Sequence, residues 1–318
     1  MANDAWDPRR LPDLSGRTYL VTGGNRGLGY FSCEQLIGAG ARVIMTGRSA
    51  TRLQSARAAL RKRVDADPSA IETMLLDTAN LGSVRAAAAS IRSRKKLDGL
   101  LLNAGIVHPP KERTTSPEGH EIVFATNVLG HFALAAELLT ILASASGRMV
   151  WVGSLATKLT PYDPMDPELR TGYTPWRAYA QSKIATTALG LEADRRLRVA
   201  GVRVASIVAH PGYSVSGRTV GIRDVNEPTR GTRFTDSLQM PITQSKEHGA
   251  WSLVRALVDP TIGGGEFWGP QFGPRGEPKR GTPAKITREP AVGERLWEHC
   301  ERASVPWPMS KAARRRRR

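Results

Sequence analysis

Short apolar runs alternate with longer segments of helical periodicity along the first two thirds of the chain. The apolar runs have the length and composition of buried strands, and they cover residues 18–22, 42–46, 71–76, 97–102, 148–153 and 203–208. The segments between them have the pattern of amphipathic helices and cover residues 28–39, 50–64, 81–94, 119–143 and 176–199. Strands that alternate with helices in this way predict repeated βαβ units.

This alternation predicts one α/β domain built on a doubly wound, Rossmann-like parallel sheet. The predicted strands are almost continuously apolar, as strands are when helices cover both faces of a parallel sheet. Right-handed crossovers put helices on both faces, and the ligands of such sheets bind at the carboxyl ends of the strands. We assign residues 13–271 to this single domain, because no Pro/Ser-rich linker divides the first 210 residues.

The last third of the chain has a less regular pattern. Residues 213–247 are polar and rich in Gly and Arg, which is typical of a functional loop, and we expect a substrate loop there. A helix over residues 246–258 and an edge strand over residues 264–271 are expected next. Residues 272–310 are expected to form an irregular C-terminal extension with a final helix at 289–302, and residues 311–318 a disordered basic tail.

The first predicted strand runs directly into a glycine-rich turn, which reads TGGNRGLG over residues 22–29. Glycines at this place let the backbone approach a pyrophosphate, while the helix that follows offers unpaired N–H groups and the positive end of its dipole. A glycine cluster alone also fits an ordinary turn between strand and helix. Its position between the first strand and the first helix favours a dinucleotide site.

Tyr179 and Lys183 lie four residues apart in the predicted helix 176–199 and therefore share one face. A lysine ammonium beside a tyrosine hydroxyl favours the phenolate, and an oxidised nicotinamide adds a second positive charge. Both lower the tyrosine pKa from about 10 towards the working pH. Such a tyrosine donates a proton to a carbonyl oxygen or accepts one from an alcohol. The spacing alone favours a surface pair, so the context has to decide.

That context resembles the compact branch of the short-chain dehydrogenase/reductase family. Further motifs of this family follow the predicted strands or lie in the long helix, namely Asn103-Ala104-Gly105, Asn127, Ser154 and Pro211-Gly212. With the glycine turn and the Tyr179–Lys183 pair they stand in the family's order over roughly residues 13–212. The resemblance implies an oxidoreductase that transfers a hydride between a nicotinamide cofactor and a carbonyl or alcohol, with Tyr179 as general acid/base.

The resemblance also implies roles for single residues. Asn127, Ser154, Tyr179 and Lys183 would be catalytic: Ser154 binds the substrate oxygen, Asn127 holds a water in a proton relay, and Lys183 holds the nicotinamide ribose. Asp77 would contact the adenine. The cofactor-binding residues would be Gly23, Asn25, Arg26, Gly27, Leu28, Gly29, Arg48, Asp77, Asn103, Ala104, Gly105, Tyr179, Lys183, Pro211 and Gly212. A homodimer or homotetramer that pairs through the two long helices is expected on the same ground.

The interval from Ser154 to Tyr179 is long, and it contains Tyr162, Met165, Tyr173 and Trp176. This spacing is similar to that of retinol-dehydrogenase-like, WW-domain-oxidoreductase-like and protochlorophyllide-reductase-like members, which implies a lipophilic substrate. These side chains fit two interpretations equally, a substrate mouth or a satellite core.

Charge at the end of the second predicted strand indicates the cofactor. An NAD site places an acidic residue there for the ribose 2′-hydroxyl, whereas this strand ends in Met-Thr-Gly followed by Arg48. Arg48 and Arg26 supply two cations suited to a 2′-phosphate. We therefore expect NADP(H), and NAD(H) less readily.

Composition restricts the remaining possibilities. The net charge of +17 would suit nucleic acid or anionic lipid, but six of the positive charges belong to residues 311–318, a tail that allows at most weak contacts of that kind. The six histidines and two cysteines form no metal-ligand pattern, so we expect no metal. No signal-peptide core and no apolar run of about 20 residues is evident, so we expect a cytoplasmic protein without a transmembrane segment. In that compartment Cys33 and Cys300 are expected to be reduced.

A second class of function stays open at this stage. A non-catalytic nucleotide-sensing or scaffold protein can share the same fold, although such proteins typically lack the tyrosine or the lysine. A sugar-nucleotide epimerase also has the Tyr-x-x-x-Lys spacing, but its glycine motif normally differs. The intact set in this chain favours an enzyme.

Overall fold

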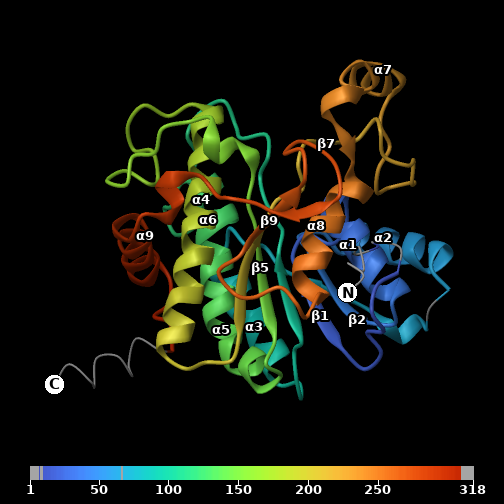
Figure 1. Ribbon diagram of the computed structural model, residues 1–318, viewed down its shortest axis with the longest axis horizontal. Coiled ribbons are helices and arrows are strands. Elements are labelled where there is room, and N and C mark those ends of the chain that lie inside the picture. The colour runs from blue at the N-terminus through green and yellow to red at the C-terminus, as the bar shows by residue number, and fades with distance from the viewer. Residues whose placement is uncertain (1–6, 8–9, 66, 309–318) are drawn as a thin grey trace, which may run out of the picture.

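The computed structural model describes residue 7 and residues 10–65 and 67–308 (Figure 1). The strands are β1 (Thr18–Val21), β2 (Arg42–Gly47), β3 (Ile71–Leu75), β4 (Gly99–Leu102), β5 (Arg148–Val152), β6 (Ala205–Ala209), β7 (Ser214–Val215), β8 (Gln244–Ser245), β9 (Phe267–Pro270) and β10 (Pro278–Arg280). The α-helices are α1 (Gly27–Gly38), α2 (Ala50–Arg63), α3 (Leu81–Arg92), α4 (Ile122–Phe124), α5 (Gly130–Ser144), α6 (Pro175–Val199), α7 (Arg230–Leu238), α8 (Lys246–Val258) and α9 (Pro290–Ala303).

Eight strands form one sheet in the order β10-β9-β6-β5-β4-β1-β2-β3. All neighbours in it are parallel except the edge pair β10–β9. The chain runs outwards from β1 to β3, then returns to β4 and runs to the other edge, so β1 and β4 lie side by side where the order reverses. This is the predicted doubly wound α/β fold, and it brings the carboxyl ends of β1, β4 and β5 to one edge, where such folds bind ligands.

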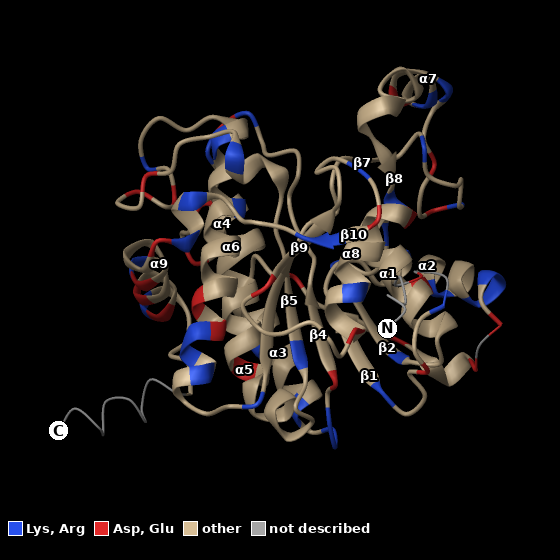
Figure 2. Ribbon diagram, in the orientation of Figure 1, with Lys and Arg blue, Asp and Glu red and all other residues tan. Residues whose placement is uncertain are grey.

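Helices cover both faces of the sheet (Figure 1). Helices α3, α5 and α6 bury one face, and α9 packs outside α6. Helices α1, α2 and α8 bury the other face. In Figure 2, Lys and Arg are spread over elements on both sides of the sheet.

Local sequence explains where most helices begin. Ser49, Asn80, Thr174 and Ser245 each precede a helix and accept a hydrogen bond from a backbone N–H in its first turn. The start of α1 differs, since the residue before it is Arg26 and no side chain caps it. The first N–H groups of α1 are therefore left for another partner.

The long helix predicted at residues 119–143 is shorter at its start and interrupted. It begins after Glu121, whose carboxylate accepts hydrogen bonds from the backbone N–H groups of Val123 and Phe124. A π-helical segment over Ala125–Leu129 then separates α4 from α5. Within the described residues, Ile122–Ser144 is the one helical stretch long and apolar enough to cross a membrane, although no apolar run of that length was predicted. However, 89% of its most apolar window is buried inside the protein. It is the core helix of the domain.

The C-terminal third is more regular than predicted. Strand β10 lies in the segment 272–287 that was expected to be irregular, so the sheet ends at β10 and not at β9. Residues 213–247 contain α7 and the two-stranded sheet β7–β8, and α7 stands away from the main sheet (Figure 1). The basic tail at 311–318 lies outside the described residues.

Candidate active site

The turn after β1 has the backbone that close approach to a ligand requires. Gly23 has φ +65°, and a Cβ there would lie 3.0 Å from the Cα of Ala104. A Cβ on Gly29 would lie 2.3 Å from the carbonyl oxygen of Gly23. Neither position accepts another residue without a shift of the backbone. Gly27 is less crowded, since the atom nearest to a Cβ there would be Lys246 Cδ at 3.9 Å, an ordinary contact distance.

Asn103, at the end of β4, fastens this turn. Its side-chain amide donates to the carbonyl oxygen of Thr22 at 2.8 Å. The backbone N–H groups of Asn103 and Ala104 both donate to Thr22 Oγ1, at 2.8 and 2.9 Å. The motif after β4 and the glycine turn are thus one rigid unit.

His131 extends this unit to the helix that carries Asn127. Its Nε2 lies 3.0 Å from Thr22 Oγ1, and its Nδ1 lies 3.1 Å from the carbonyl oxygen of Asn127. A carbonyl oxygen only accepts, so Nδ1 donates there and Nε2 accepts from the Thr22 hydroxyl. Burial, together with the charge of Lys183, lowers the pKa of His131 to about 3, so the ring is neutral and this tautomer is fixed.

Tyr179 and Ser154 meet at the carboxyl edge of the sheet. Ser154 directly follows Gly153 at the end of β5, and Tyr179 lies in the second turn of α6. The Tyr179 hydroxyl donates to Ser154 Oγ at 3.1 Å. Ser154 Oγ also accepts from the N–H of Ala156 at 3.2 Å, which fixes its rotamer.

Lys183 lies one turn beyond Tyr179 and is 6% exposed. Its Nζ donates to the carbonyl oxygen of Val152 at 2.8 Å. Burial lowers the pKa of Lys183 to about 8. Burial also raises the pKa of Tyr179, and the hydrogen bond to Ser154 opposes this only in part. The lowering of the Tyr179 pKa by Lys183 that the spacing predicted is therefore absent from the interactions within the chain.

Asn127 lies in the π-helical segment, a distortion that is frequent at functional sites. Its Oδ1 accepts from the N–H of Ile106 at 2.8 Å, and its Nδ2 donates to the Ile106 carbonyl oxygen at 3.2 Å and to Ser182 Oγ at 2.9 Å. Ser182 in turn donates to the carbonyl oxygen of Tyr179 at 2.7 Å. Asn127 therefore connects the loop after β4 with the helix that carries Tyr179.

The other residues expected to bind a cofactor surround the same edge. Arg26 and Arg48 follow β1 and β2, are exposed and form no ion pair with a described residue. Asp77 follows β3 and is half-buried, with its carboxylate accepting from the N–H of Ala79. Pro211 and Gly212 follow β6, where Gly212 has φ +65°. The structure thus brings Gly23, Asn25, Arg26, Gly27, Leu28, Gly29, Arg48, Asp77, Asn103, Ala104, Gly105, Asn127, Ser154, Tyr179, Lys183, Pro211 and Gly212 to strand ends, or to helix turns beside them, along this edge.

The aromatic side chains between Ser154 and Tyr179 divide into two groups. Trp176 is 49% exposed, and its ring lies 6.3 Å from that of Tyr179. Tyr173 instead packs on Val123 and Leu169 and donates its hydroxyl to the Pro110 carbonyl oxygen at 3.0 Å. Tyr162 packs against the main core. Of these three aromatic side chains, only Trp176 is therefore placed beside Tyr179.

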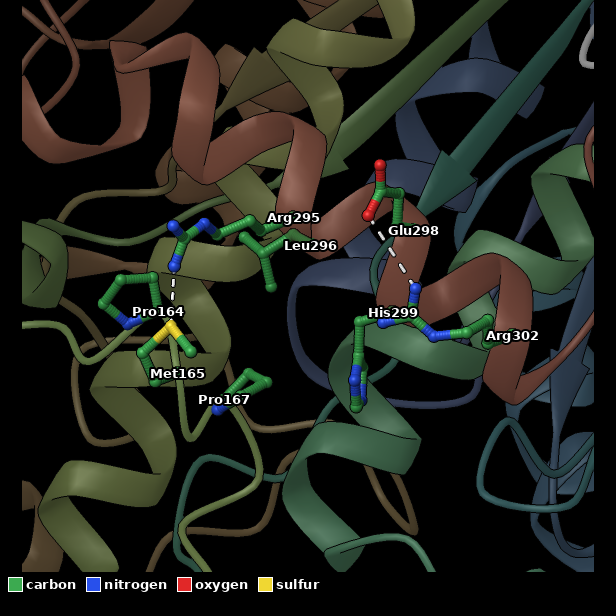
Figure 3. A pocket seen from close by; sticks show the side chains of 8 residues that line it. All are labelled: Pro164, Met165, Pro167, Arg295, Leu296, Glu298, His299 and Arg302. Carbon is green, nitrogen blue, oxygen red and sulfur yellow. Dashed lines mark hydrogen bonds and ion pairs between the residues drawn. The ribbon is translucent and has the colours of Figure 1, made fainter.

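A pocket of about 280 Å³ lies between this interval and α9 and contains none of the predicted catalytic residues (Figure 3). Met165 and Arg295 contact each other across one side of it, while His299 lines the other. Behind it, buried Glu168 accepts from His299 at 2.7 Å and from His120 at 3.0 Å. These hydrogen bonds lower the pKa of Glu168 to about 2 against the opposing effect of burial. Glu168 therefore joins α9 to the loop before α4.

Sequence reasoning missed Thr22, His131 and Ser182. The position of each in the sequence could have indicated its role. Thr22 ends the predicted strand before the glycines, His131 follows Asn127 by four residues, and Ser182 follows Tyr179 by three. Residues three or four apart on a helix share a face, so His131 and Ser182 had to lie near the predicted residues. Which atoms they contact depends on the tertiary fold.

Comparisons with known proteins agree with this arrangement. The family model for short chain dehydrogenase matches residues 17–223, a range that includes the glycine turn and the Tyr179–Lys183 pair. A "Probable oxidoreductase" of Streptomyces lividans is 34% identical over 299 residues and covers 90% of this chain and 97% of its own length. Retinol dehydrogenase 14 of Mus musculus is 32% identical over 268 residues, with 80% and 78% covered. The crystal structure of an uncharacterized Mycobacterium paratuberculosis protein matches with a TM-score of 0.76 at 29% identity, covering 95% of this chain and 99% of that chain.

Proposed function

The chain belongs to the short-chain dehydrogenase family of oxidoreductases, and on this premise we propose that it transfers a hydride between NADP(H) and a carbonyl or alcohol, with Tyr179 as general acid/base. One observation carries the proposal. The Tyr179 hydroxyl lies 3.1 Å from Ser154 Oγ at the ligand edge of a doubly wound sheet. Two hydroxyl groups at this distance can bind one substrate oxygen between them, which is the geometry that proton transfer to that oxygen requires.

The residues present fit a nicotinamide cofactor. The turn at Gly23 admits close backbone approach, the nearest neighbour of the Cβ position on Gly27 is 3.9 Å away, and the first turn of α1 has no side-chain cap. These features suit a pyrophosphate. The cofactor, when bound, supplies or accepts the hydride; the chain's own residues bind it, orient the substrate and move the proton.

The proton chemistry follows from the contacts of Tyr179. During reduction, its hydroxyl gives a proton to the carbonyl oxygen while Ser154 donates a hydrogen bond to the same oxygen. The charge of Lys183 stabilises the phenolate that remains, once its ammonium is close enough to act on it. Asn127, held by Ile106 and Ser182, would hold the water through which the proton is replaced.

The preference for NADP(H) rests on Arg26 and Arg48. Both are exposed at the ends of adjacent strands, and neither forms an ion pair with a described carboxylate. A guanidinium pair of this kind suits the dianionic 2′-phosphate. No acidic residue follows β2 to bind a ribose 2′-hydroxyl instead.

A lipophilic substrate is supported by the surroundings of Tyr179. Trp176, beside it, is half exposed, and the protruding segment around α7 exposes Phe234, Leu238 and Met240. Exposed apolar side chains beside Tyr179 and in the expected substrate loop are those that an apolar substrate would cover. The similarity to a protein named retinol dehydrogenase 14 points the same way.

The experiment that tests the function is an absorbance assay of the purified protein at 340 nm. Aliphatic, aromatic and isoprenoid ketones, aldehydes and alcohols are offered, each with NADPH or NADP⁺ and, separately, with NADH or NAD⁺. We expect turnover with an apolar substrate and a higher kcat/KM with NADP(H). A clear preference for NAD(H) would contradict the Arg26 and Arg48 argument. Tight NADPH binding without turnover of any substrate would favour the nucleotide-sensing alternative.

A further inference from the structure

Lys246, the first residue of α8, lies over the glycine turn although it comes from the far end of the substrate loop. Its Cδ lies 3.9 Å from the point that a Cβ on Gly27 would occupy, and it is the nearest atom there. Its Nζ donates to Ser216 Oγ at 2.5 Å and lies 3.4 Å from Asn226 Oδ1. The Lys246 side chain thus lies beside Gly27 at the start of α1.

The charge of Lys246 has no matching anion. Both of its side-chain acceptors are neutral, and no described carboxylate lies within ion-pair distance of it. Its pKa is lowered first by burial and then by the neighbouring charge of Arg26, and the charge of Asp236, whose carboxylate accepts from the N–H of Gly217, offsets this only in part. Two cations therefore face the same uncapped helix start. Two like charges that are only partly offset by a counter-charge favour the binding of an anion between them.

We propose that Lys246 binds the pyrophosphate of the cofactor and so contributes a phosphate-binding residue from the substrate loop. This inference rests on the proposed function, since it requires that a dinucleotide binds at the glycine turn. Lys246 would thus be a pyrophosphate-binding cation that comes from outside both the glycine turn and the strand ends. The ammonium has three N–H donors and contacts two acceptors, Ser216 Oγ and Asn226 Oδ1, so its third N–H would bind a phosphate oxygen in a stronger, charge-assisted hydrogen bond.

The contacts of Lys246 also connect the cofactor site to the loop. Its backbone N–H donates to Thr219 Oγ1 at 2.9 Å. Asn226 is buried, and its Nδ2 donates to the carbonyl oxygens of Ser216 and Val220 at 3.2 and 3.0 Å. Residues 216–226 are therefore one folded turn built around the Lys246 side chain. Phosphate binding at Nζ fixes this turn, so cofactor binding orders one side of the substrate site.

The test compares Lys246→Met and Lys246→Arg with the wild type. Dissociation constants for NADPH, NADH and 2′-AMP are measured by fluorescence quenching and by competition. We expect Lys246→Met to weaken NADPH and NADH by the same factor, about tenfold or more, because both contain the pyrophosphate. Binding of 2′-AMP, which lacks it, stays unchanged. Lys246→Arg, which keeps the charge, restores most of the affinity, and Lys62→Met on the exposed face of α2 controls for the loss of one charge.

Amide hydrogen exchange measures the second part of the inference. In the wild type, NADPH should protect the amides of residues 216–226, and at saturating NADPH this protection should be reduced in Lys246→Met. Unchanged nucleotide affinity in Lys246→Met would overturn the inference, as would a loss confined to NADPH, which would place Lys246 at the 2′-phosphate. A wild-type protein that binds neither dinucleotide would overturn the proposed function itself.

Discussion

The ammonium group of Lys183 is buried, and burial disfavours its charged form. Its ammonium is 6% exposed and is bound by one neutral carbonyl oxygen, that of Val152. The pKa of about 8 means that the group is charged at neutral pH but close to losing its proton. A buried ammonium has three N–H donors, and only one of those of Lys183 has an acceptor among the described residues. The hydroxyl groups of a bound ribose would supply further neutral acceptors.

This pKa predicts how cofactor binding depends on pH. The ammonium is present below about pH 8 and is lost as the pH rises through that value. NADPH affinity should therefore fall as the pH rises from 7 to 9.5, with a midpoint near 8. The measurement is a fluorescence titration with NADPH at several pH values. Lys183→Met should bind NADPH more weakly at pH 7 and lack the step, and an equal step in this variant would assign the titration to another group.

Residue types at the active site were easier to predict than their contacts. Ser154, Tyr179 and Lys183 stand at spacings that the fold converts into proximity, and the structure places the first two within hydrogen-bond distance. Lys183 and an oxidised nicotinamide were expected to lower the Tyr179 pKa, whereas within the chain itself burial raises this pKa. A local spacing reveals which charges are near in sequence but not how much solvent the folded chain removes from them.

At the scale of elements, α9 is part of the main core. Trp297 is 1% exposed and packs edge-on against Phe132 of α5, with ring centroids 5.0 Å apart. Trp307 lies against both rings, and the Arg196 guanidinium lies 4.6 Å from the Trp297 ring. The pattern of residues 289–302 predicted the helix correctly. It did not reveal this docking, because the partners of an amphipathic face are set by the fold.

We expect Trp297→Ala to destabilise the protein by about 3–5 kcal/mol, because the change leaves a cavity among Phe132, Trp307 and α6. Urea unfolding measures the free energy of unfolding. Phe272→Ala is the matched control, since Phe272 is 70% exposed and its loss should cost less than about 0.5 kcal/mol. Similar values for the two variants would show that α9 contributes little to the core.

The whole molecule explains why the candidate site forms at all. Residues from Thr22 to Gly212 converge because parallel strands end at one edge, and the reversal of strand order between β1 and β4 opens that edge. The alternation of apolar runs was sufficient to predict this sheet. It was not sufficient for α7, β10 or the π-helical segment, since these short elements depend on tertiary contacts such as the pairing of β10 with β9.

The structure of the expected substrate loop, residues 213–247, was the hardest part of the fold to predict from the sequence. Its polar composition predicted a loop, and composition carries no signal for the turn built around Lys246. That turn depends on Asn226, which is 20 residues earlier and buried by contacts that only the folded chain makes. We propose that the same region selects the substrate, which a panel of substrates would test directly.

The central claim is that Tyr179 transfers the proton, and Tyr179→Phe tests it most directly. The substitution removes one hydroxyl and keeps the ring beside Trp176. With a substrate that the wild type reduces, we expect kcat to fall at least about 100-fold, the contribution typical of a general acid, while the dissociation constant for NADPH stays within about twofold. Turnover by Tyr179→Phe at the wild-type rate, with NADPH still bound, would contradict the account.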